Sequence, residues 1–444
     1  MEQDAIAQIR QYRQQAASLL LYQSVLADSI GQTWLSLMDA LYQGSEVSVA
    51  IAYGKFFSAS AEQQQSWQSY LIAQILASDN AFSQQAQTVS IEQIPPALLA
   101  GAQHDLGILQ TLHNLSSAHI AQWVQAISDT SHPPAIDFPS ADSALPFVDQ
   151  FVDPFVDPFA KQFVEQLAEQ SDWNEAPQAL ARYYRAHGVG IFGKFGAFRW
   201  QAGQLIGIAD PDPIQLHQLA AYDHPKQQLI QNTESLLQGY TAQNVLLYGS
   251  RGAGKSSLVK ALLNEYRHRG LRLIEVPKGD LHNLPQIVEK LARVPQKFII
   301  FVDDLSFEED DEAFKALKVV LEGGVTARPQ NVVVYATSNR RHLVREFFEE
   351  RPRPQDADEI QAWDTVQEKL SFSDRFGLTL TFAPADQPTY LQIVRELTTQ
   401  AGLEIDTEHL EWRARQWATR HNGRSGRTAR QFVDFLMAEQ GQEN

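Results

Sequence analysis

Apolar side chains in the first hundred residues recur every three to four positions, a spacing that predicts amphipathic helices. The apolar stripes lie at residues 19–26, 34–41 and 67–76, and glutamine is frequent between them. Glutamine favours helix and solvates a surface without adding charge. Another helical pattern, PQALARYYRAH, follows near residue 180. The sequence therefore predicts an all-helical, Gln-rich N-terminal domain over residues 1–205.

Prolines break this pattern over residues 132–163 and exclude a continuous helix there. The repeat PFVDQFVDPFVDPFAKQF within this segment spaces its phenylalanines four residues apart, at Phe147, Phe151, Phe155, Phe159 and Phe163. Two interpretations are open. The segment is either a docking strip for a partner or a linker whose phenylalanines pack back onto the helical domain, and we favour the linker.

The glycine string GVGIFG, with Gly188, Gly190 and Gly193, has the spacing of a dinucleotide-binding fingerprint. That fingerprint needs a strand before the glycines and a helix after them. Here a helical pattern precedes the string, and the aromatic, glycine-rich stretch KFGAFRW follows it. We therefore expect a loop or hairpin at this point and no nucleotide site.

Beyond residue 206, and after a linker signal at DPDPI, short β-branched apolar runs alternate with helical segments. Five such runs, at residues 244–248, 271–276, 297–302, 331–337 and 378–382, are typical of buried parallel strands in an α/β domain. From about residue 387 onward the patterns are helical only. We expect a five-stranded parallel αβα core over residues 206–385 and a helical lid over residues 386–444.

The strongest chemical signal is the segment GSRGAGKSS, which follows the first apolar run and opens a helical pattern. Its members are Gly249, Ser250, Arg251, Gly252, Ala253, Gly254, Lys255, Ser256 and Ser257. Glycines let backbone N–H groups turn toward phosphates, and the helix N-terminus adds its positive dipole. Lys255 would reach the β- and γ-phosphate oxygens, and Ser256 would offer a hydroxyl to Mg²⁺. The segment predicts a P-loop that binds ATP with Mg²⁺.

Polar residues after two later runs supply further groups. Asp303 follows KFIIFV, where a carboxylate would orient the hydration shell of Mg²⁺, and Asp304 could polarise the attacking water. Asn339 follows NVVVYAT, where an amide would reach the γ-phosphate. Thr337 and Ser338 are weaker candidates for that role, and the alternative for Asn339 is the N-cap of the next helix.

Arginines near the C-terminal end add two candidates. Arg375 could enter a neighbouring subunit's site and stabilise charge on the transferred phosphoryl group, and the alternative is a surface ion pair with Asp374. Residues 411–430 hold six arginines against one glutamate. Arg427 or Arg430 could fold over the nucleotide, and the alternatives are a nucleic-acid patch or a solvated basic helix.

In this order the five elements resemble the AAA+ ATPases, with Walker A, Walker B, sensor 1, arginine finger and sensor 2. The strings LLYGSRGAGKSSLVKALLNEY, FIIFVDDLSFEEDDEAFKALKVVLEGG, YATSNRRHL and GRSGRTARQF are similar to a bacterial family of AAA+-like ATP-binding proteins of unknown function, over roughly residues 206–440. The resemblance implies that residues 249–256 bind ATP and that Asp303 serves Mg²⁺. It also implies that Asn339 is sensor 1, Arg375 the finger and Arg427 sensor 2.

One position departs from the AAA+ pattern, which has glutamate after the Walker B aspartate. Asp304 is one methylene shorter, so a water held by glutamate would lie about an ångström out of its reach. Glu308 and Glu309 could substitute. The sequence therefore supports ATP binding more strongly than hydrolysis.

The composition limits which cellular compartment and which classes of partner are compatible with the chain. The 444 residues include 36 basic and 53 acidic side chains, a net charge of −17, of which residues 1–205 carry −11. Such charge argues against nucleic acid as the main partner. Cysteine is absent, which excludes disulfide scaffolds and thiol chemistry. No run is apolar enough to span a membrane and no signal-peptide pattern opens the chain, so we expect a cytoplasmic protein.

The leading hypothesis is an ATPase that remodels a protein partner chosen by the N-terminal domain. Its catalytic residues would be Asp304, Asn339, Arg375 and Arg427. Because Arg375 would act on a neighbouring subunit, we expect a homo-oligomer. The alternatives are an ATP-dependent switch or adaptor with slow or no hydrolysis and, less favoured, a loader of nucleic-acid machinery.

Overall fold

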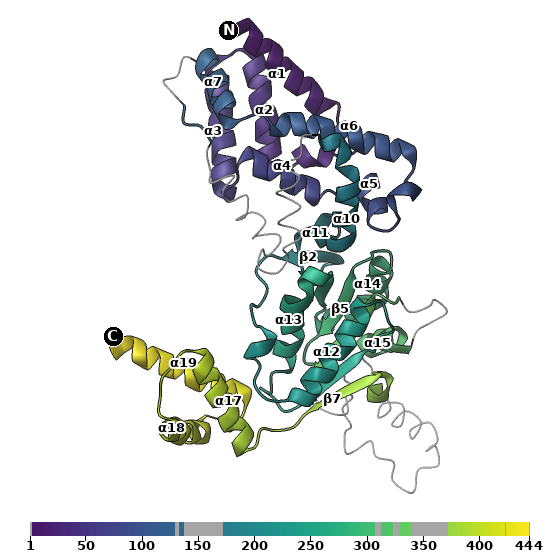
Figure 1. The fold of residues 1–444 in the computed structure, drawn as a ribbon. Helices are drawn as coiled ribbons and strands as arrows, with labels where there is room; N and C mark the ends of the chain where they lie inside the picture. The colour runs from purple at the N-terminus through teal and green to yellow at the C-terminus, as the bar shows by residue number, and fades with distance from the viewer. Residues whose placement is uncertain are drawn as a thin grey trace. The chain divides into compact units, whose positions relative to one another are not determined.

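The computed structural model describes residues 2–128, 133–136, 172–306, 312–322, 329–339, 372–421 and 423–443. The phenylalanine repeat at 147–163 lies outside these residues. The chain divides into two compact units, Met1–Phe195 and Gly196–Asn444 (Figure 1). The second unit therefore begins before the boundary that the sequence predicted at residues 205/206.

The described residues of the first unit form helices and no strand. Two apolar stripes of the sequence coincide with α2 and α4, and the PQALARYYRAH pattern forms α10. The helices are α1 (Glu2–Ala17), α2 (Ser29–Gln43), α3 (Glu46–Gln63), α4 (Trp67–Leu76), α5 (Ala81–Ala86), α6 (Pro96–His113), α7 (Ser117–Ser128), α10 (Pro177–His187) and α11 (Gly190–Lys194). All of them except α11 contribute to one apolar cluster, in which the indole rings of Trp34 and Trp67 stack with centroids 4.7 Å apart.

The stripe at residues 19–26 is not an amphipathic helix, because a buried carboxylate takes its backbone N–H groups. Asp105 on α6 is fully buried. Its carboxylate accepts hydrogen bonds at 2.7–2.9 Å from the N–H groups of Leu20, Leu21 and Tyr22. These donors cannot also serve a helical ladder. The chain turns here, and a 3₁₀ helix (Gln23–Leu26) leads into α2.

Among the described residues of the second unit, seven strands form one sheet in the order β2–β1–β4–β5–β6–β3–β7. Neighbouring strands pair in parallel, except that β1 and β2 form an antiparallel hairpin. The strands are β1 (Ala197–Gln201), β2 (Gln204–Ile208), β3 (Val245–Gly249), β4 (Leu271–Glu275), β5 (Lys297–Val302), β6 (Val332–Ser338) and β7 (Leu378–Phe382).

The helices of this unit follow the α/β alternation that the sequence predicted. Among the described residues they are α12 (Asp223–Leu237), α13 (Lys255–Tyr266), α14 (Leu284–Leu291), α15 (Glu312–Glu322), α17 (Gln387–Gln400), α18 (Thr407–Arg420) and α19 (Gly426–Glu443). Helices α12 and α13 bury alternate residues of the strands in one apolar cluster, including Leu247, Ile299 and Val333. Every second side chain of each strand therefore points to the face of the sheet that α12 and α13 cover.

The five predicted runs are the strands β3 to β7, which confirms the parallel core. The prediction of a five-stranded sheet was wrong in number, because the β1–β2 hairpin extends the sheet beyond β4. The boundary expected at residue 206 consequently falls inside β2. The GVGIFG string does not form the expected loop or hairpin itself. Its last four residues belong to the short helix α11 (Gly190–Lys194), and the β1–β2 hairpin follows this helix.

Parallel pairing brings the carboxyl ends of β3, β5 and β6 to one edge of the sheet. β3 pairs with β6 so that Tyr248 lies beside Ser338, and β5 pairs with β6 on its other side so that Val302 lies beside Ala336. The residues that follow these three strands are those in which the sequence placed its chemistry. They are therefore neighbours in space, at the edge where α/β sheets bind their ligands.

Helices α17, α18 and α19 carry an apolar cluster of their own, centred on Tyr390, Leu410 and Phe432. Asp386 caps α17 by accepting the N–H of Thr389 at 2.9 Å. Alanines that lie outside these three helices also pack against this cluster, namely Ala220, Ala221 and Ala385. None of the described helices combines the length and the hydropathy needed to cross a bilayer.

We expect Asp105→Ala to lower the free energy of unfolding of the first unit by about 3 kcal/mol, because three backbone donors lose a buried charged acceptor. Calorimetric unfolding of the whole chain measures the change. Asp39→Ala is the control, since Asp39 pairs with Arg13 at the surface. Exposed pairs contribute about 1 kcal/mol or less. Equal losses in the two variants would contradict the role given to Asp105.

Candidate functional site

The loop between β3 and α13 begins at a glycine that tolerates no side chain. Gly249 has a φ of +137°, and an added Cβ would lie 2.0 Å from the carbonyl oxygen of Phe382 on β7. Ser250 donates its N–H to that same oxygen at 2.9 Å. At the other end of the loop, Gly254 has a φ of +84° and precedes α13 without a side-chain cap. The N–H groups of the first turn of α13 are thus uncapped beside the loop, as an anion site requires.

Lys255 opens α13 and is only 7% exposed. Its ammonium donates to the carbonyl oxygens of Gly249 and Ser250 at 2.9 and 2.8 Å, and its Nζ lies 3.4 Å from Asn339 Oδ1. Burial lowers the pKa of this ammonium, and two carboxylates across the pocket oppose that shift. The positive charge is therefore held inside the loop.

The carboxylate of Asp303 gathers two hydroxyl groups from different elements onto one oxygen. Ser256 on α13 donates to Asp303 Oδ1 at 2.6 Å, and Thr337 on β6 donates to the same oxygen at 2.5 Å. The structure thus brings together the two residues, Ser256 and Asp303, that the sequence nominated for a metal. A hydroxyl beside a carboxylate is an all-oxygen set of the kind that Mg²⁺ prefers.

Asp304 follows in the left-handed backbone conformation, with a φ of +50°. Aspartate adopts this region more readily than most residues because its short polar side chain can bond locally. Its N–H donates to Thr337 Oγ1 at 2.9 Å, and its carboxylate accepts from Asn339 Nδ2 at 2.6 Å. Asn339 therefore lies between the loop lysine, Lys255, and the second acid, Asp304.

Thr337 has a place that the sequence did not predict. The sequence offered it only as a weaker candidate for the role of Asn339. In the structure it is buried, donates to Asp303 and accepts from the backbone of Asp304, so that one side chain holds both acids. Ser338, the other weaker candidate, donates to the carbonyl of Leu305 instead. The sequence feature that could have predicted this role is a threonine near the end of the strand that pairs with the strand before Asp303 and Asp304.

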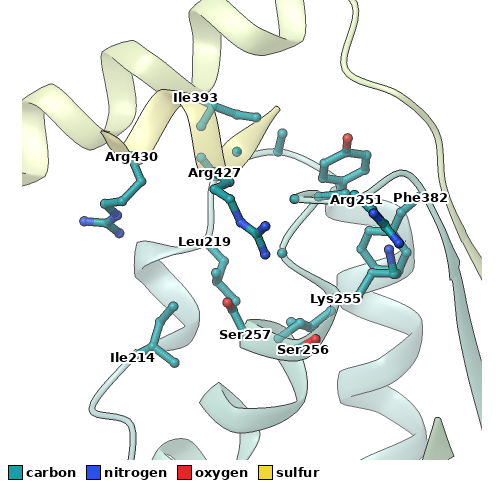
Figure 2. A pocket seen from close by; sticks show the side chains of 18 of the residues that line it. Ile214, Leu219, Arg251, Lys255, Ser256, Ser257, Phe382, Ile393, Arg427 and Arg430 are labelled. Carbon is teal, nitrogen blue, oxygen red and sulfur yellow. The ribbon is translucent and has the colours of Figure 1, made fainter. Parts of the chain in front are cut away.

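A pocket of about 610 Å³ opens over this loop (Figure 2). Its volume is within the range of small-molecule sites. The basic side chains that line it are Lys226, Arg251, Lys255, Arg427 and Arg430, and the acidic ones are Asp303 and Asp304. A formal charge of +3 on this lining, in a chain with a net charge of −17, favours an anionic ligand.

Apolar side chains form one wall of the pocket. One of them, Ile214, belongs to the DPDPI segment that the sequence suggested to be a linker. The wall includes Ile214, Leu219, Tyr222 and Phe382. Ala221 and Tyr222 both have positive φ values, +62° and +58°. The Tyr222 hydroxyl donates to the carbonyl of Ala383 at 2.7 Å, and its ring centroid lies 5.3 Å from that of Phe382. Backbone held in such sparsely populated regions is frequent at ligand sites.

Of the two arginines that the sequence left open, Arg427 points into the pocket and Arg430 points away from its centre (Figure 2). The backbone N–H of Arg427 donates to the carbonyl of Gly252 at 3.2 Å. A Cβ added to Gly252 would lie 3.1 Å from Arg427 Cβ, so the start of α19 rests directly on the loop. This position agrees with the sensor 2 role, which stays a prediction.

Arg375 does not line the pocket. It ends a 3₁₀ helix (Phe372–Arg375), and its guanidinium pairs with Glu322 on α15 at 2.9 Å, with the side chain 19% exposed. To reach a neighbouring subunit's site, the guanidinium would have to leave Glu322. The finger role stays a prediction. Glu308 and Glu309, the proposed substitutes for a longer acid, lie outside the described residues.

A family model described as "Protein of unknown function (DUF815)" matches residues 193–440, more than half of the chain. The chain belongs to this DUF815 family. The match confirms the family resemblance that the motifs carry. It also begins close to Gly196, where the second unit begins.

Two curated relatives align over short stretches of this DUF815 chain. The replication factor C large subunit of Staphylothermus marinus is 34% identical over 122 residues, which are 25% of this chain and 28% of that protein. Its counterpart from Sulfolobus acidocaldarius is 38% identical over 82 residues, 18% of each chain. The chain therefore spans less than a third of the length of either relative.

Solved structures give distant matches. The RuvB Holliday junction branch migration motor of Thermotoga maritima is 14% identical, covers 50% of this chain and 72% of its own, and has a TM-score of 0.31. A replication initiator DnaA bound to AMPPCP and single-stranded DNA is 17% identical, covers 50% of this chain and 64% of its own, and has a TM-score of 0.35. At this level, neither likeness bears on function.

We expect Gly249→Ala to abolish nucleotide binding and to lower the free energy of unfolding of the second unit by at least about 2 kcal/mol, because the new methyl would overlap Phe382. Titration calorimetry and thermal unfolding measure the two effects. Gly239→Ala is the matched control, since its φ is +82° but nothing lies within 4 Å of the added Cβ. It should cost only the backbone strain, about 1 kcal/mol. Indistinguishable variants would show that the contact with Phe382 is unimportant.

Proposed function

We propose that this chain binds ATP with Mg²⁺ in the pocket and hydrolyses the bond between its β- and γ-phosphates. The observation that carries the proposal is the convergence of Lys255, Ser256 and Asp303 around an uncapped helix N-terminus. The N–H groups of the loop and the Lys255 ammonium would bind the phosphate chain. The apolar wall would receive the base, and Arg427 would approach the γ-phosphate.

Ser256 and Asp303 would hold the magnesium ion. When bound, the ion would neutralise charge that develops on the phosphate oxygens. The described residues contain no group of three or more His, Asp or Glu side chains placed to hold a metal by themselves. The remaining ligands would therefore be nucleotide oxygens and water, which is the usual way Mg²⁺ is bound with phosphates.

Asp304 and Asn339 would orient the attacking water. Asn339 Nδ2 donates to Oδ1 of Asp304, so the other carboxylate oxygen can accept a proton from water. Asn339 also lies beside the Lys255 ammonium. The amide would therefore respond to phosphate near Lys255 and transmit that response to Asp304.

The same contacts favour a second candidate, an ATP-dependent switch with slow or no hydrolysis. Asp304 is one methylene shorter than glutamate and one of its carboxylate oxygens is held by Asn339, so the remaining oxygen would polarise water weakly. A chain that binds ATP without hydrolysing it would signal by binding alone. The turnover rate separates the two functions.

For the ATPase, we propose that the hydrolysis cycle remodels a protein partner selected by the first unit. That unit is acidic and glutamine-rich, which suits a protein surface better than a phosphate backbone. A homo-oligomer would be required if Arg375 leaves Glu322 to act on a neighbour.

The C-terminal arginines do not favour the third candidate, a loader of nucleic-acid machinery. Arg413 pairs with Glu439 and Arg424 bonds Gln387, while two others line the pocket. Of the six arginines in residues 411–430, Arg415 and Arg420 are exposed outside the pocket and have no described partner. Two isolated positive charges would bind the phosphate backbone of a nucleic acid only weakly.

Lys255→Ala should weaken binding of magnesium–ATP at least about tenfold and abolish hydrolysis, because the only ammonium inside the loop is lost. Titration calorimetry and phosphate release measure the two effects. Lys260→Ala is the control, since Lys260 lies on the same helix but pairs with Asp212 at the surface. Wild-type protein that shows no heat at millimolar ATP would refute the proposal. Wild-type protein that binds ATP but turns over no faster than Lys255→Ala would be a switch.

Thr337→Val should lower turnover at saturating ATP at least about tenfold, whereas Thr337→Ser should keep most of it. Only serine retains the hydroxyl that holds Asp303 and Asp304, and valine retains the shape of threonine. Steady-state kcat and KM, each measured over a series of magnesium concentrations, separate this effect from a loss of ATP affinity. An active Thr337→Val variant would show that the acids need no positioning from β6.

A further inference from the structure

Arg251 is a free cation inside the loop. Its side chain lines the pocket together with Lys255 and the two acids, and it is exposed. In the part of the chain that the structure describes, it makes no hydrogen bond and no ion pair. Two other arginines of this unit are paired, Arg375 with Glu322 and Arg413 with Glu439. A guanidinium that lines a ligand pocket without a counter-charge is available to an anion.

The place of Arg251 along the loop selects which phosphate it can meet. Arg251 directly follows Ser250, whose carbonyl holds the Lys255 ammonium at 2.8 Å. That ammonium also lies 3.4 Å from Asn339 Oδ1. Arg251 therefore starts on the side of the loop where Lys255 and Asn339 would meet the terminal phosphate. The proposed metal ligand Ser256 directly follows Lys255 at the start of α13, and Arg251 lies four residues before Lys255 in the loop.

The chemistry of the guanidinium suits a terminal phosphate. Its planar fork donates two parallel hydrogen bonds to phosphate oxygens and stays charged at every relevant pH. A terminal phosphoryl group presents more free oxygens than a bridging one, and its charge changes during transfer. Two flexible cations, Arg251 from the loop and Arg427 from α19, would thus approach the same group from different elements.

We propose that Arg251 is a ligand of the γ-phosphate and makes this pocket distinguish ATP from ADP. The inference rests on the proposed function, because it names a contact within the same nucleotide site. In this proposal, the arginine that contacts the transferred γ-phosphoryl group is part of the phosphate loop itself. Charge stabilisation at that group then does not depend on Arg375, whose guanidinium is held by Glu322.

Binding of two nucleotides to three variants tests the assignment. Arg251→Gln should weaken magnesium–ATP binding at least about tenfold and magnesium–ADP binding less than about twofold, because only ATP has the γ-phosphate. Arg251→Lys should keep part of the preference, since it keeps the charge but loses the fork. Arg415→Gln, which removes one exposed positive charge from α18 outside the pocket, should change neither affinity. Titration calorimetry with the full chain gives all the dissociation constants.

The outcomes separate this inference from the proposed function. Wild-type protein that binds neither nucleotide would overturn both. Wild-type protein that binds ATP while Arg251→Gln loses equal affinity for ATP and ADP, or loses none, would overturn the γ-phosphate contact alone. Turnover adds an independent readout, since kcat of Arg251→Gln should fall at least about tenfold. Circular dichroism should show unchanged folding, because the native side chain is exposed and has no described contact to lose.

Discussion

The close approach of two backbones, at Gly249 on β3 and Phe382 on β7, determines where the phosphate loop begins. The two residues face each other in the parallel ladder, and an added Cβ on Gly249 would lie 2.0 Å from the Phe382 carbonyl oxygen. Ser250 extends the contact by donating to that same oxygen. Five residues later α13 begins with Lys255. The ammonium, the uncapped helix N-terminus and the Ser256 hydroxyl therefore take their positions from one contact between two strands.

The central strands and the loop could be predicted because their physics is local. A strand buried on both faces of a parallel sheet needs an apolar run, and the central strands β3, β5 and β6 have one, whereas the edge strand β7 alternates leucine with threonine. A phosphate loop needs glycines at positions of positive φ and a lysine at the helix start, and both can be recognised directly in the amino-acid sequence. The hairpin β1–β2 has no such signature, because both strands are partly exposed. Its place in the sheet depends on pairing with β4, far along the chain.

The rest of the site could not be predicted because it depends on register and on irregular backbone. Thr337 reaches Asp303 and Asp304 only because β5 and β6 pair with Val302 beside Ala336. The Tyr222 ring meets the pocket because residues 221 and 222 adopt positive φ values that no sequence pattern announces. In the first unit, Asp105 overrides a helical stripe from more than eighty residues away. In that last case a long-range contact outweighs a local preference, as context commonly does.

The contact between Gly252 and the start of α19 limits how the loop can respond to a ligand. The Arg427 N–H donates to the Gly252 carbonyl, and a Cβ on Gly426 would lie 2.9 Å from that oxygen. Any rotation of the peptide after Gly252, as its neighbours turn toward phosphates, must therefore break this bond or carry α19 along. Helices α17, α18 and α19 are packed together in one apolar cluster, so they would follow as a group. The same hydrogen bond that seats Arg427 over the loop is thus the element through which events at the phosphates would move the C-terminal helices.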